Sequence, residues 1–197
     1  KKTLSDMDVK ILEIGCGCGA WSYLLKKAEF NVISTDLCNN NKSTMGNVFA
    51  QKQFPSHLIK IDELNAVRSV VKYPDCNILF TSFLLPDSYQ RPDPYDVKCI
   101  KSFKGDFIII IGVYGINSNG DEILDYRATG SRKLIKLLNE QWQLIEFVLS
   151  GAKSGFNGSE PNIIGIGIYQ RVSAASDAAE RRSHPRTLYK GDQPLRL

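Results

Sequence analysis

Short apolar segments alternate with longer amphipathic segments along most of the chain. Five segments have the length and apolar character of strands, and they occupy residues 9–13, 31–36, 57–61, 76–82 and 106–112. Three segments between them repeat apolar residues at helical spacing, and they occupy residues 20–28, 43–53 and 63–72. Strands that alternate with helices in this way predict a parallel sheet with helices on both faces. The fifth strand, DFIIIIG, is the most hydrophobic, as expected of a central parallel strand.

The pattern changes after the fifth strand. A helix over residues 131–140 is followed by two strands, residues 144–149 and 163–169, with only a Gly- and Ser-rich loop between them. Two consecutive strands without a crossover helix must pair antiparallel or belong to different sheets. The predicted fold is therefore α/β: a doubly wound, mostly parallel seven-stranded sheet that ends in an antiparallel hairpin strand. We assign residues 1–171 to one domain and residues 172–197 to a polar C-terminal extension, either flexible or able to bind RNA or a partner.

Composition narrows the class of protein. The chain has 197 residues, 43% of them hydrophobic, and a net charge of +4, which is too small to indicate nucleic acid by itself. No apolar run approaches the roughly 18 residues of a membrane span, so we expect no membrane partner. Five cysteines at irregular spacings favour free thiols in a reducing, cytoplasmic compartment. With only two histidines, we expect no metal site.

The strongest chemical signal lies between the first strand and the first helix. Residues 13–19 read Glu-Ile-Gly-Cys-Gly-Cys-Gly. Glycines at this place let the backbone turn tightly and approach a ligand where a Cβ atom would collide. The spacing G-x-G-x-G differs from the dinucleotide fingerprint G-x-G-x-x-G, and the strand ends in an acidic residue, Glu13. The loop therefore indicates a nucleotide-like ligand other than a nicotinamide dinucleotide.

The pattern E-x-G-x-G-x-G resembles the first motif of the class I S-adenosylmethionine-dependent methyltransferases, and the order of elements over residues 8–171 is similar to theirs. The resemblance implies S-adenosyl-L-methionine as cofactor. It also implies that Asp36 binds the ribose hydroxyls and that Asp62 contacts the adenine amino group. As an alternative, Asp62 is the N-cap of the helix that follows. The cofactor-binding residues expected from the motif and the strand ends are Glu13, Gly15, Cys16, Gly17, Gly19, Asp36, Leu37, Asp62, Glu63, Ser82 and Phe83.

Two subfamilies are disfavoured by residues that this chain lacks. RNA 2′-O-methyltransferases carry an Asp at the end of strand four and a Lys at the end of strand five, whereas this chain has residues 81–83 (TSF) and 112–113 (GV) there. Base and glutamine N-methyltransferases carry Asn/Asp-Pro-Pro-Tyr/Phe after strand four, and this chain does not. Trp21, which follows the glycine loop, is interpreted as a core residue of the first helix.

The exit of strand four is the place where an acceptor would meet the methyl group. Asp87 and Tyr89 are the candidate catalytic residues there, as a general base or as groups that orient the acceptor. Phe83 and Tyr114 are expected to form apolar walls. Three nearby prolines, Pro86, Pro92 and Pro94, predict a stiff loop over the site or an irregular connection.

These observations predict a methyltransferase that acts on an N, O or S atom of RNA, protein or a small molecule. The first strand begins near residue 9, so we expect a site open to a large substrate, or one closed by a partner or by missing N-terminal sequence. The first residue is Lys1 rather than Met, which indicates processing or a fragment. The alternatives are a non-catalytic domain of the same fold that binds a protein or RNA, and an aminopropyltransferase.

Overall fold

Eight strands form one mixed sheet in a computed structural model, which describes residues 8–37, 59–86, 94–116, 122–125, 128–153 and 163–172. The strands are β1 (Lys10–Ile14), β2 (Asn31–Asp36), β3 (Ile61–Glu63), β4 (Ile78–Ser82), β5 (Phe107–Ile116), β6 (Glu122–Leu124), β7 (Trp142–Lys153) and β8 (Ile163–Arg171). The helices are α1 (Ala20–Lys27), α2 (Ala66–Lys72), α3 (Tyr95–Ser102) and α4 (Arg132–Gln141).

The strand order in space is β3-β2-β1-β4-β5-β8-β7, and the short β6 pairs with β5 outside this path. Strands β1 to β5 pair in parallel, whereas β8 lies antiparallel between β5 and β7. The predicted doubly wound, mostly parallel sheet with an antiparallel C-terminal hairpin is therefore confirmed. The carboxyl ends of β1, β2 and β4 meet at one edge, where the order of connections reverses, and this edge is where open α/β sheets bind ligands.

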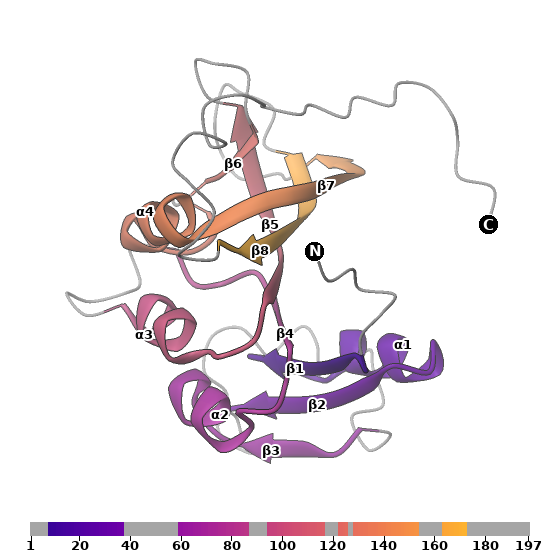
Figure 1. Ribbon diagram of the computed structural model, residues 1–197. Helices are drawn as coiled ribbons and strands as arrows, with labels where there is room; N and C mark the ends of the chain where they lie inside the picture. The colour runs from indigo at the N-terminus through magenta and orange to yellow at the C-terminus, as the bar shows by residue number, and fades with distance from the viewer. Residues whose placement is uncertain are drawn as a thin grey trace.

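The two faces of the sheet carry different helices. Helices α2, α3 and α4 stand on one face and α1 on the other (Figure 1). The larger core joins the three helices to residues such as Leu12, Leu79 and Ile108, all fully buried. A smaller core lies on the α1 face, around Ile11, Phe80 and the partly buried Leu25. The sheet is thus apolar on both sides, which explains why the central strands are continuous hydrophobic runs.

Side-chain caps fix the start of two helices, α2 and α4. The Asn65 side chain accepts a hydrogen bond from the Arg68 N–H (2.8 Å) and begins α2, and Ser131 does the same for α4 through Leu134 (3.1 Å). Helix α1 begins after Gly19 without any side-chain cap. Its first N–H groups therefore point toward the glycine loop without a side chain of the helix to satisfy them.

Three differences from the sequence prediction concern elements near the site. The third strand spans Ile61–Glu63 rather than residues 57–61, so Asp62 lies within the strand and not after it. Residues 95–102, expected as loop, form α3, and residues 122–124 form β6. The predicted helix over residues 43–53 and the extension from residue 173 onward lie outside the described residues. None of the described helices is long and apolar enough to cross a bilayer.

Candidate functional site

The glycine loop adopts a backbone that only glycine takes without strain. Gly15, Gly17 and Gly19 have φ angles of 64°, 57° and 79°, all in the left-handed region. A Cβ atom placed on Gly15 would meet no atom within 4 Å, so this glycine is required by its conformation and not by crowding. The backbone of the loop is therefore turned so that a ligand can approach it closely.

Asp36, at the end of β2, is bonded to this loop. Its carboxylate oxygen Oδ2 accepts a hydrogen bond from the Gly17 N–H at 2.8 Å, although the two residues are 19 positions apart in the chain. Asp36 is 9% exposed. A carboxylate has about four lone-pair sites, so it can bind this N–H and also accept from ligand hydroxyls. The hydrogen bond thus holds an acidic group at the edge of the sheet beside the open side of the loop.

Glu13, the acidic residue before the loop, is buried under α1. Only 1% of the residue is exposed. The Ser22 hydroxyl of α1 donates to its Oε2 atom, and the Ser34 hydroxyl of β2 donates to Ser22 Oγ at 2.5 Å. The other carboxylate oxygen, Oε1, is buried and accepts no hydrogen bond from the described part of the chain. The pKa of Glu13 is raised to about 7, chiefly by burial; the Ser22 hydrogen bonds act against the rise and the neighbouring Asp36 charge adds to it.

The two acidic residues of β3 face opposite sides of the sheet. In the parallel register Asp36 pairs with Glu63 and Thr35 pairs with Asp62. Glu63, which is exposed, therefore shares the face and the strand edge of Asp36, whereas Asp62 lies on the face that carries α2. Glu63 is accordingly better placed than Asp62 to contact a ligand held by Asp36.

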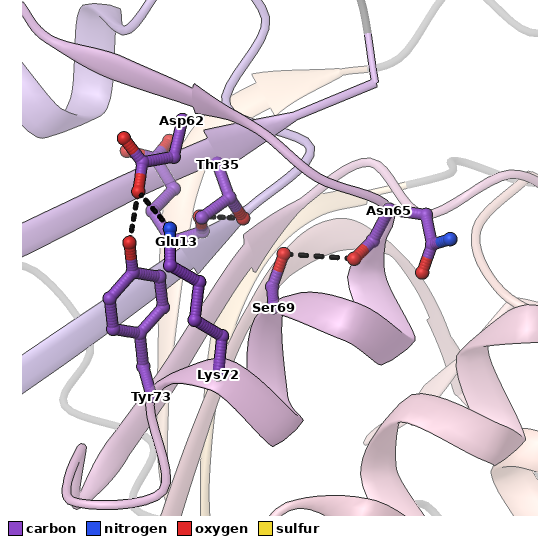
Figure 2. Close-up of polar contacts among 7 residues, drawn as sticks. All are labelled: Glu13, Thr35, Asp62, Asn65, Ser69, Lys72 and Tyr73. Carbon is purple, nitrogen blue, oxygen red and sulfur yellow. Dashed lines mark hydrogen bonds and ion pairs between the residues drawn. The ribbon is translucent and has the colours of Figure 1, made fainter.

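Figure 2 shows how Asp62 is engaged on the α2 side. Its Oδ2 atom accepts from the Tyr73 hydroxyl and from Lys72 Nζ (3.0 Å), both at the end of α2. These two donors, Tyr73 first, lower the pKa of Asp62. The alternative role of Asp62 as an N-cap is wrong, because Asn65 caps α2. The predicted contact between Asp62 and adenine stays a prediction.

The exit of β4 presents an aromatic side chain in a strained conformation. Phe83 has φ of 52° and is 46% exposed, and its N–H donates to the Ile111 carbonyl at 2.8 Å. A bulky residue in the left-handed region costs on the order of 1 kcal/mol or more, and such strain is concentrated at functional sites. Leu37, directly after Asp36, is 68% exposed at the same edge of the sheet. Two apolar side chains thus stand open near the glycine loop.

Loop contacts hold the β4 exit in place. The Leu84 carbonyl accepts from the Gly130 N–H at 3.1 Å, and the Leu85 N–H donates to the Tyr95 hydroxyl at 3.3 Å. Asp96, buried in the first turn of α3, accepts from both the N–H (2.8 Å) and the hydroxyl (3.0 Å) of Ser131. Helix α3 therefore ties the loop after β4 to the start of α4. The sequence analysis missed this arrangement.

The predicted locations of two aromatic residues, Tyr114 and Trp21, are wrong. Tyr114 forms no wall of the site: it is 1% exposed, its hydroxyl donates to the Ile110 carbonyl (3.1 Å), and its ring packs on Phe147 with centroids 4.7 Å apart. Trp21 is not a core residue, because it is 37% exposed, although its ring centroid lies 6.1 Å from that of Phe80. The buried residue of α1 is its neighbour, Ser22.

The remaining candidates lie in the glycine loop, at the end of β4 and in the segment that follows β4. Cys16 is buried, and burial together with the Glu13 and Asp36 charges raises the pKa of its thiol, so it is an inert lining residue. Ser82 ends β4 beside Phe83. The catalytic candidates Asp87 and Tyr89 lie outside the described residues. The structure therefore brings together Glu13, the loop glycines, Asp36 and Glu63, with Phe83 on a neighbouring strand.

Comparison with known proteins gives a match to the fold. Neither family models nor curated proteins match the chain. Among solved structures, the match with a TM-score of 0.51 belongs to a study of how a disulfide bond becomes a thioacetal group during echinomycin biosynthesis. It is 13% identical and covers 89% of this chain and 82% of the other. At this identity the match shows a shared fold and no more. The strand order, with β8 antiparallel between β5 and β7, is that of the class I S-adenosylmethionine-dependent methyltransferase fold.

Two further matches are named as methyltransferases. One is an S-adenosylmethionine-dependent methyltransferase from Mesorhizobium loti, 9% identical over 83% of this chain and 91% of the other, with a TM-score of 0.45. The other is the magnesium protoporphyrin IX methyltransferase from Synechocystis, solved with bound S-adenosylmethionine. It is 11% identical over 83% of this chain and 70% of the other, with a TM-score of 0.49.

Proposed function

We propose that this chain is an S-adenosylmethionine-dependent methyltransferase. The observation that carries the proposal is the hydrogen bond from the Gly17 N–H to Asp36 Oδ2 (2.8 Å), which joins a left-handed glycine loop to a carboxylate at the switch point of the sheet. A ligand of this site must offer hydroxyl groups to the carboxylate and a compact group to the loop backbone. A nucleoside that carries an amino-acid chain meets both requirements, because its ribose offers the hydroxyl groups and its amino-acid part is the compact group.

The residues present fit this cofactor. The open space at Gly15 admits the ligand to the loop backbone, and the uncapped start of α1 supplies N–H groups for a carboxylate. Asp36, with Glu63 on the next strand, would hold the ribose hydroxyls. The buried carboxyl group of Glu13, with its unpartnered Oε1 atom, lies under the loop, and its ionised form would suit a ligand that carries positive charge.

S-adenosylmethionine supplies a methyl group on a positively charged sulfur, which an N, O or S nucleophile displaces in line. The chain's part in this reaction is to align the acceptor with the methyl group and to exclude water from the line of attack. Phe83 is the residue placed for the second task, since its ring is exposed and its backbone is fixed to β5. Asp87 would accept the acceptor's proton where the nucleophile needs a base.

The acceptor is proposed only as a class. We favour a large acceptor such as RNA or protein, because the exposed side chains of Leu37 and Phe83 present apolar surface at the carboxyl edge of the sheet. A partner chain or further sequence of the same polypeptide would serve as a cover in that case. A small-molecule acceptor needs such a cover most, because a small acceptor brings no surface that excludes water.

Two measurements test the proposal. In a titration series, S-adenosylmethionine and S-adenosylhomocysteine should bind, whereas NAD should not, and decarboxylated S-adenosylmethionine tests the aminopropyltransferase alternative. Incubation with cofactor labelled in the methyl group, together with fractionated cell extract, should then place label in the protein, RNA or small-molecule fraction. Binding without transfer to any fraction would support the non-catalytic alternative, and absence of binding would overturn the proposed function.

A further inference from the structure

Glu13 combines features that are costly for a residue with a merely structural role. It is 1% exposed, one of its carboxylate oxygens is without a hydrogen bond from the described residues, and the other is held by Ser22. Burying an ionised carboxylate that is not fully hydrogen-bonded is strongly unfavourable, so such a group tends to take up a proton. A well-packed apolar residue would stabilise this position better.

Charged and titratable groups near Glu13 come from each described element that packs against it. On β2, Asp36 shares its face of the sheet, because Glu13 pairs in register with Ser34, two residues before Asp36. Lys26 of α1 acts weakly in the opposite direction, and the thiol of Cys16, just beyond β1, stays protonated. The paired strand β4 contributes the uncharged Phe80 opposite Glu13. In the empty site the surroundings therefore disfavour the charge on Glu13.

We propose that Glu13 is a proton switch that distinguishes the charged cofactor from its uncharged-sulfur product. The inference rests on the proposed function. The cofactor carries a positive sulfonium that the product lacks, because the bonding electron pair stays on sulfur when the methyl group leaves. When the positive charge lies over the glycine loop, Glu13 releases its proton to solvent. When the sulfur is neutral, Glu13 takes a proton back, and the site loses part of its preference for the ligand that occupies it.

The direction of the pH dependence follows from this linkage. Binding of the cofactor selects ionised Glu13, so the apparent affinity rises with pH and levels off above the pKa of the free protein, about 7. At pH 6 only about one-tenth of the free protein is ionised. The affinity for S-adenosylmethionine should therefore be up to about tenfold weaker at pH 6 than at pH 8. The affinity for S-adenosylhomocysteine should change clearly less.

The test is calorimetric titration of both ligands at pH 6, 7 and 8, each in two buffers of different ionisation enthalpy, with the wild-type chain and with Glu13→Gln. The amine of each ligand, with a pKa near 8, titrates equally in both proteins, so the difference between them isolates Glu13. We expect wild type to release a fraction of a proton with S-adenosylmethionine at pH 7. We expect Glu13→Gln to release only the protons that come from the ligand's own amine. Its affinity for S-adenosylmethionine should change with pH only as far as that amine titrates.

A second variant keeps the test independent of the folding of Glu13→Gln. The Ser22 hydroxyl lowers the pKa of Glu13, so Ser22→Ala should move the midpoint of the pH dependence to higher pH. The inference is overturned if wild type and both variants share one pH dependence, or if the cofactor and the product show the same dependence. Absence of binding at every pH would instead contradict the proposed function, so the two failures are distinguishable.

Discussion

At the scale of single residues, the site depends on two carboxylates with opposite surroundings. Asp36 lies at the strand edge and accepts a backbone N–H, whereas Glu13 lies beneath the loop with one unpartnered oxygen. Two acidic groups in such different surroundings are suited to separate tasks in one binding site. In this chain Asp36, at the strand end, is suited to hydrogen-bond a ligand, and Glu13, beneath the loop, to respond to the charge of that ligand.

Glu13 should make the stability of the folded chain depend on pH. Because burial raises its pKa from 4.5 to about 7, the native state keeps a proton that the unfolded chain releases. Stability therefore falls as pH rises through that window, by up to roughly 3 kcal/mol from this group. The uncharged Glu13→Gln should match wild type near pH 5 and unfold at a higher temperature at pH 8. Thermal unfolding at both pH values checks this, and parallel pH profiles for the two proteins would contradict it.

The residues of the site differ in how far the sequence could predict them. Glu13, the glycines and Asp36 could be predicted from their spacing, because the glycine motif and the end of the second strand determine their positions. The face of the sheet on which Asp62 lies could not be predicted. The third strand was placed a few residues too early, and this left open which of Asp62 and Glu63 points to which side. Ser22 and Ser34 were missed although each interrupts an apolar pattern, which was the available signal.

At the scale of elements, the end of α1 contains a second positive φ. Glu29 has φ of 66° at the position after the helix cap, with the Phe30 N–H bonded to the Leu25 carbonyl and the Glu29 N–H to the Lys26 carbonyl, both at 3.0 Å. This is the Schellman arrangement, in which glycine is preferred. Glu29→Gly should therefore stabilise the chain by about 1 kcal/mol, measured by urea unfolding, without a change in cofactor affinity.

Phe83 offers the matching change inside the site. Phe83→Gly relieves the same backbone strain but removes the ring that faces the acceptor. We expect it to leave cofactor affinity within a few-fold and to slow methyl transfer at least tenfold once an acceptor is known, whereas Glu29→Gly should leave transfer unchanged. Equal turnover in the two variants would show that the acceptor does not approach across Phe83.

The elements themselves were mostly predictable, and the exceptions have physical reasons. Hydrophobic runs placed β1, β4, β5 and β8 within a few residues. Helix α3 was missed because prolines before it indicated a loop, although proline is well tolerated at a helix start, and Pro94 stands there. Strand β6 has three residues and no pattern of its own.

At the scale of the whole molecule, the last described residues hold the end of β8 against the neighbouring helix ends. The Arg171 guanidinium donates to the Phe103 carbonyl (2.8 Å) and to the Gly105 carbonyl, and it lies 4.2 Å from the centre of the Trp142 ring. The Val172 N–H donates to the Gln141 carbonyl at 2.9 Å. The end of β8 is thus fixed to the segment after α3 and to the end of α4.

A chain that ends at Val172 should therefore keep the fold and the cofactor affinity of the full chain. Arg171→Ala in the full chain should destabilise it by about 2 kcal/mol, because three carbonyl contacts and a cation–π contact are lost. Circular dichroism and thermal unfolding compare the two. A truncated chain that unfolds would show that residues after 172 belong to the folded domain.

The central claim is that Asp36 and the glycine loop bind S-adenosylmethionine, and calorimetric titration of Asp36→Asn beside Asp62→Asn tests it most directly. Both changes remove one carboxylate charge from neighbouring strands, but Asp62 faces α2, where it bonds Tyr73 and Lys72. At pH 8, above the Glu13 midpoint, loss of charge-assisted bonds of about 1.5–3 kcal/mol should weaken binding to Asp36→Asn about 10- to 150-fold. Asp62→Asn should bind within about twofold of wild type. Unchanged affinity in Asp36→Asn, or an equal loss in both variants, would contradict the account.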